Sequence, residues 1–198
     1  IEEDNYLETV SVADGGDPQF ELTGMHGGGN DTSHYNLITV KGIGDNLLGE
    51  GGETPENIQA AADNIHSWLQ DAWDAMRSGT GYNTKGKHYS DYIDMESFAK
   101  MYLMQEYVKS YDVCAGSILF HRDGQTEADK LIAGPIWDLD NAMGSTQSNS
   151  GLGTVADRKS GKGAFNTEIN EDSYKTSLYK PLYQHEDFQL EVARQYNK

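Results

Sequence analysis

The stretch that decides the fold lies at residues 117–144 and reads SILFHRDGQTEADKLIAGPIWDLDNAMG. Two apolar runs, SILFH and KLIAGPIW, flank a polar segment in which Asp123-Gly124 supplies the chemistry of a turn. This pattern predicts two antiparallel strands. The second strand runs directly into the acidic segment WDLD, which carries Asp138 and Asp140. We therefore expect a rigid strand that holds two carboxylates at its tip.

The expected strand pairing brings a third carboxylate to the same place. A register with His121 opposite Lys130 suits the connection, and it places Asp112 opposite Leu139. Three carboxylates at one strand end form an oxygen-rich site of the kind that binds Mg²⁺ together with substrate phosphates. One of them can also serve as a general base toward a hydroxyl.

The amino-acid composition limits the kinds of partner that the chain is expected to bind. The chain has 198 residues, enough for one sizeable core or for one lobe of a larger domain. Its 15 basic and 32 acidic residues give a formal net charge of −17, which argues against nucleic acid or an anionic membrane as partner and permits divalent cations. No run has the length of a transmembrane helix, so no membrane insertion is expected. The first residues, IEEDNYLETV, suggest a mature or excised piece.

The remaining elements follow from local signals. Three short strands are expected in YLETVSV, QFELTG and YNLITVKG, between glycine-rich loops. Thr54 and Pro55 mark the start of an amphipathic helix, and Asp94 caps a second helix at about 95–110. Apolar side chains occupy nearly every face of that second helix, so it is expected to be central and buried. Two helices near 173–183 and 186–196 close the chain.

Two stretches resemble a known family. IDMESFAKMYLMQEYVKSYDVCAGSILFHRDG, followed by KLIAGPIWDLDNAMG, is similar to the core of CotH proteins, which are spore-coat and secreted atypical protein kinases. The resemblance implies an α+β, atypical protein-kinase-like fold, mainly the helical C-lobe with a catalytic β-hairpin and a few N-terminal strands. Residues 1–198 are then expected to be one partial CotH kinase-like domain without the upstream part that covers the nucleotide. The chain would become active when that part completes it.

The resemblance also implies an activity, the transfer of phosphate from ATP to Ser or Thr of a protein with Mg²⁺ as cofactor. Asp112 would be the catalytic aspartate, and Glu106, late in its helix, would orient Asp112 or its loop. Asp138 would hold the metal, as the aspartate of the kinase Asp-Phe-Gly motif does, and Asp140 would assist. The His-Arg-Asp triplet at residues 121–123 is a coincidence, because the kinase motif must precede the hairpin and cannot lie in its tip.

Two further residues are expected beside the cofactors. Ser117 occupies the place where protein kinases put a metal-binding Asn, although a neutral hydroxyl is a weaker ligand. Trp137 precedes the metal-binding acid and is as well suited to the core as to contact with the nucleotide. The partner would be a protein substrate or a surface-assembly protein. The location would be extracellular, or the cell or spore surface of a bacterium.

Two other functions stay open at this point. The chain could be a non-catalytic, acidic extracellular scaffold or adhesion module whose carboxylates bind Ca²⁺ instead. A glycosidase with two carboxylates needs acids on both sides of a sugar cleft, and here the acids cluster at one strand end. The glycosidase therefore ranks last.

Overall fold

The structure is a computed structural model, and it describes residues 7–10, 18–23, 37–41, 48, 52, 54–108, 118–124, 126, 128–137, 139, 142 and 178–198. Within these ranges it contains both helices and an antiparallel sheet, so the predicted α+β class is confirmed.

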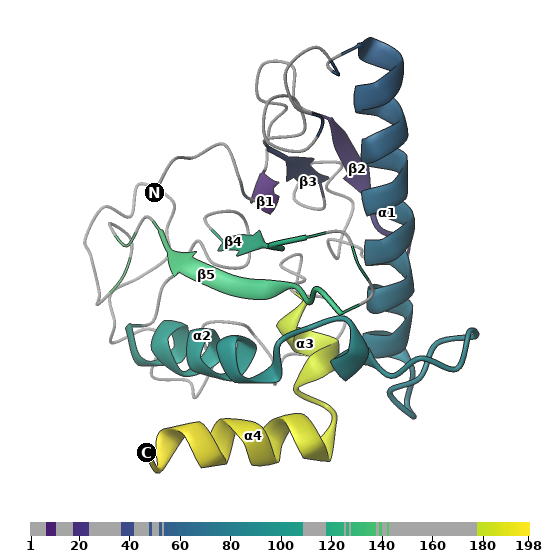
Figure 1. Cartoon of the computed structure of the whole chain (residues 1–198). Helices are drawn as coiled ribbons and strands as arrows, with labels where there is room; N and C mark the ends of the chain where they lie inside the picture. Colours follow the sequence, from purple (N-terminus) through teal and green to yellow (C-terminus); the bar gives the residue numbers. More distant parts are fainter. Residues whose placement is uncertain are drawn as a thin grey trace, which may run out of the picture.

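Five strands form one sheet in the order β2-β3-β1-β4-β5, with every neighbouring pair antiparallel (Figure 1). The strands are β1 (Leu7–Val10), β2 (Gln19–Glu21), β3 (Leu37–Val40), β4 (Ile118–His121) and β5 (Ile132–Ile136). All five lie inside segments that the sequence predicted as strands. The sequence did not predict that β1 pairs with β4, with Leu7 opposite Phe120. This pairing joins the N-terminal strands to the hairpin in a single sheet.

The hairpin forms as predicted, but the predicted register is wrong. His121 pairs with Ile132 and not with Lys130, and an irregularity between Phe120 and Ile118 then places Ile118 opposite Ile136. The pairing is therefore displaced by two residues at His121 and by three at Ile118, relative to the predicted register. The reason is a longer connection than the turn signal suggested.

Arg122 holds that connection together. Its Nε donates to the Asp129 carbonyl oxygen at 2.7 Å and its Nη2 to the Thr126 carbonyl oxygen at 2.6 Å. The guanidinium also lies 4.1 Å from the ring centre of Trp68 on the first helix. These contacts tie Arg122 to residues 126 and 129 beyond the end of β4, and the strand pairing begins on β5 at Ile132.

Helices form in the segments predicted as helices, and the two with capping signals, after Thr54 and after Asp94, begin where those signals predicted. They are α1 (Pro55–Arg77), α2 (Met95–Val108), α3 (Tyr179–Leu182) and α4 (Glu186–Tyr196), with a 3₁₀ turn, η3 (Tyr89–Asp91). Thr54 Oγ1 accepts a hydrogen bond from the Asn57 amide at 3.2 Å, and Pro55 opens the first turn of α1. The predicted helix at 173–183 is observed only as α3, since residues 173–177 lie outside the described residues.

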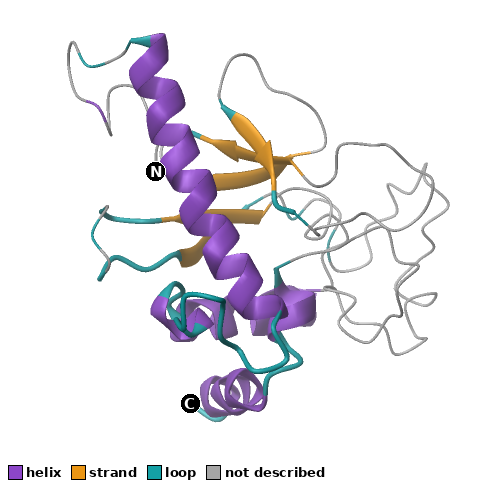
Figure 2. Ribbon diagram, turned by 90° about the vertical axis from the view of Figure 1, so that its right-hand side faces the viewer, coloured by secondary structure: helices purple, strands orange, loops and turns teal. Residues whose placement is uncertain are grey.

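The core lies between α1, the sheet and the C-terminal helices. Figure 2 shows α1 crossing the strands on one face of the sheet. One cluster of buried side chains draws on all of these layers, with Trp73 from α1, Ile38 from β3, Phe98 from α2 and Phe188 from α4. Burial of large apolar side chains from several elements is the main stabilising contribution to such a domain.

The second helix is less buried than the sequence predicted. In Figure 1, α2 lies between β5 and α4. Phe98 and Tyr102 are buried, but Met104 is 40% exposed and Tyr107 is 76% exposed. The helix is therefore central but less completely buried than predicted, because among the described elements β5 and α4 cover only part of its circumference.

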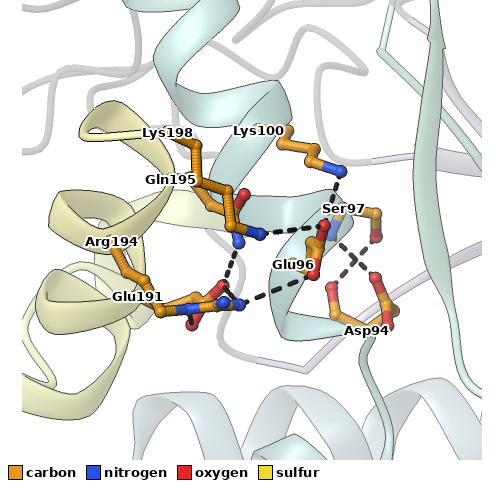
Figure 3. A network of polar contacts seen from close by, with 8 residues as sticks. All are labelled: Asp94, Glu96, Ser97, Lys100, Glu191, Arg194, Gln195 and Lys198. Atoms are coloured by element: carbon orange, nitrogen blue, oxygen red, sulfur yellow. Dashed lines mark hydrogen bonds and ion pairs between the residues drawn. The ribbon is translucent and has the colours of Figure 1, made fainter.

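A polar network fastens α4 to α2. Figure 3 shows Glu96, at the start of α2, among three cations. Its carboxylate lies 2.6 Å from Lys100 Nζ, 3.5 Å from Arg194 Nη2 and 3.5 Å from Lys198 Nζ. The hydrogen bond from Lys100, with the charges of Lys100 and Lys198, lowers the pKa of Glu96 to about 2. Because Arg194 lies in the last turn of α4, Lys198 just follows it and Glu96 begins α2, the two helices run antiparallel.

Candidate functional site

Backbone contacts between the start of α2 and the start of β5, which we call the clamp, position the candidate site. Ile93 and Leu131 form an isolated parallel bridge, the Asp94 amide donates to the Leu131 carbonyl oxygen at 2.8 Å, and the Leu131 amide donates to the Tyr92 carbonyl oxygen at 2.8 Å. Ile93 and Leu131 are both fully buried. The start of α2 is thus fixed beside the start of β5.

A serine in the first turn of α2 continues this clamp. Asp94 caps the helix as predicted, since its Oδ1 accepts from the Ser97 amide at 2.7 Å (Figure 3). Ser97 Oγ donates to the Asp94 carbonyl oxygen at 3.0 Å and accepts from the Ala133 amide at 3.1 Å. One hydroxyl therefore links the helix cap directly to the backbone of β5.

These contacts make α2 and β5 run side by side in the same direction. Further along, a Cβ placed on Gly134 would lie 3.8 Å from Met101 Cε. At about 1.5 Å per helical residue, Val108 lies roughly 21 Å beyond Asp94 along α2. At about 3.3 Å per strand residue, Trp137 lies roughly 20 Å beyond Leu131 along β5. The two elements therefore end at the same level.

The start of β4 reaches this level as well, because Ile118 lies opposite Ile136 near the end of β5. Three chain ends consequently meet at one end of the hairpin: the end of α2, the start of β4 and the end of β5. The segment 109–117 connects the first two ends, and the acidic segment WDLD begins at the third. The predicted pairing of Asp112 with Leu139 does not follow from the corrected register, and Asp112 lies outside the described residues.

Four of the predicted site residues lie outside the described residues. They are Asp112, Ser117, Asp138 and Asp140. Their roles stay predictions. Within the described ranges, no three His, Cys, Asp or Glu side chains gather into a group that could hold a metal ion.

The other two predicted residues are described. Glu106 is half-buried in the last two turns of α2, close to the segment that carries Asp112. Trp137 directly follows β5 and is 44% exposed. Trp137 is thus not a core residue, and its ring has a face that a ligand can contact. Its neighbours Ile136 and Leu139 are also exposed, which gives this end of the hairpin an apolar surface beside the acidic segment.

The His-Arg-Asp triplet lies at the opposite, closed end of the hairpin. β4 ends at His121, Arg122 binds the connection as described above, and the Asp123 side chain is 76% exposed. The triplet thus lies in the tip of the hairpin, where the sequence placed it.

Sequence reasoning missed one polar residue of α2. Gln105 is only 1% exposed, one helical turn after Met101 and next to Glu106. Among the described residues, its Nε2 donates to Met101 Sδ at 3.7 Å and no donor reaches its Oε1. An unsatisfied buried acceptor costs about 1–3 kcal/mol. The signal was present in the sequence as a polar residue on a helical stripe that is otherwise apolar.

None of the helices in the described part of the chain combines the length and apolar character needed to cross a membrane.

Comparison with known proteins identifies the family to which the chain belongs. The chain matches the family described as CotH kinase protein over residues 46–198, which is well over half of its length. The matched region includes the clamp, the hairpin and all six predicted site residues. No curated protein and no solved structure matches the chain, so the kinase-like part of the predicted fold stays a prediction. The chain belongs to the CotH kinase protein family.

Proposed function

We propose that this chain, completed by the upstream part of the CotH domain, binds ATP with Mg²⁺ and transfers the γ-phosphate to a Ser or Thr hydroxyl of a protein. Membership of the CotH kinase protein family supports the kinase-like chemistry. The observation that carries the proposal is the meeting of the end of α2, the start of β4 and the end of β5 at one level.

Chain length supports a common site for the carboxylates. Asp112 is four residues from Val108, so its Cα lies within about 14 Å of the end of α2. Asp138 directly follows Trp137, so their Cα atoms are about 3.8 Å apart. Since both flanking residues lie at the same end of the hairpin, the proposal needs no rearrangement of the described elements to bring these acids together.

The proposed roles follow from residue type. Asp112 accepts the proton of the acceptor hydroxyl while the hydroxyl oxygen forms its bond to the γ-phosphorus. The bond from that phosphorus to the oxygen shared with the β-phosphate breaks, and ADP leaves. Asp138 and Asp140 offer the carboxylate oxygens that Mg²⁺ prefers, and the bound ion would neutralise charge on the phosphates.

Three more residues complete the proposed site. Glu106 lies where it can orient the segment that carries Asp112. Ser117 offers a hydroxyl oxygen as an additional, weaker ligand beside the metal. Trp137 offers an exposed indole face for stacking against the adenine ring.

The test is phosphate transfer from labelled ATP with Mg²⁺ to a casein acceptor by the full-length protein that contains this chain, comparing its Asp112→Asn and Asp138→Asn variants with the unchanged protein. We expect each variant to lose about 100-fold or more, which is the usual contribution of a positioned acid or base. Asp123→Asn is the matched control, because Asp123 is an exposed aspartate at the closed end of the hairpin. Equal labelling by the unchanged protein and Asp112→Asn would refute the assignment.

A second candidate is an acidic extracellular scaffold that binds Ca²⁺ without catalysis, favoured by the formal net charge of −17. Calorimetry separates the two functions, since the scaffold binds Ca²⁺ alone and the phosphotransferase binds Mg²⁺ with ATP. An extracellular or spore-surface location is part of both proposals and is supported by the Gly, Asn, Asp and Ser content.

A further inference from the structure

We draw no further inference here: the strongest candidate, the exposed apolar surface of Ile136, Trp137 and Leu139 at the open end of the hairpin, adjoins the site already described, and nothing in the described part of the chain shows what covers it.

Discussion

The hydroxyl of Ser97 offers the sharpest test of the clamp between α2 and β5. Ser97→Ala removes two hydrogen bonds, one donated to the Asp94 carbonyl oxygen and one accepted from the Ala133 amide. At about 1 kcal/mol net for each bond, their loss costs about 2 kcal/mol. Alanine is the better helix former and returns about 0.5 kcal/mol. We therefore expect the free energy of unfolding to fall by about 1.5 kcal/mol.

The assay is urea unfolding followed by circular dichroism, with a thermal melt beside it. For a chain of this size the expected loss lowers the melting temperature by roughly 3–6 °C. Ser67→Ala is the matched control, because Ser67 is an exposed serine in the middle of α1 and its replacement changes helix propensity alone. If Ser97→Ala is as stable as Ser67→Ala, the Ser97 hydroxyl does not link α2 to β5. The hydroxyl would then not explain why α2 and β5 end at the same level.

Two further perturbations test the packing around the clamp. Burial and the hydrogen bond to the Asp187 carboxylate raise the pKa of Tyr89 well above its usual value of about 10, so this proton stabilises the fold below pH 10 and its contribution is lost as pH rises further. Tyr89→Phe should make the fall in unfolding free energy above pH 10 shallower in urea titrations, and an unchanged slope would contradict this reasoning. Gly134 has φ +124°, a backbone conformation that strains any residue with a side chain, so Gly134→Ala should lower the free energy of unfolding by about 1–3 kcal/mol in urea unfolding. Gly79→Ala is the control: a Cβ at Gly79 would meet nothing within 4 Å, so its unfolding should be almost unchanged.

Local signals in the sequence predicted the elements well. Thr54 with Pro55, and Asp94 before α2, predicted both helix starts because a cap acts through the nearest backbone amides. Alternating apolar runs likewise predicted all five strands. Each of these features is decided within a few residues of chain, and so a single sequence contains the necessary information.

Contacts between distant segments were not predictable in the same way. The hairpin register depends on Arg122, which binds the connection and also stacks on Trp68 of α1. The pairing of β1 with β4 joins segments about a hundred residues apart. Neither contact has a signature in the strands themselves, because the hydrophobic alternation of a strand fixes its face and leaves its partner position open.

The same difference between local and distant information applies to the residues of the candidate site. The family pattern predicted the carboxylates from residue type and order, and both depend on the sequence alone. Gln105 was missed because a single polar residue in an apolar helix predicts nothing until its neighbours are known. Its importance depends on the burial that α2 acquires against β5 and on the donor that its Oε1 lacks among the described residues.

The corrected register bears directly on the site. Under the predicted pairing, the start of β4 would lie three residues further from the acidic segment than it does with Ile118 opposite Ile136. Three strand residues correspond to about 10 Å. The observed register therefore places the start of β4 nearer to WDLD than predicted, although the pairing of Asp112 with Leu139 does not follow from it. The Ser97 clamp independently brings the end of α2 to the same level. Because two unrelated sets of contacts converge on one end of the hairpin, a shared carboxylate site there does not depend on the register that the sequence predicted.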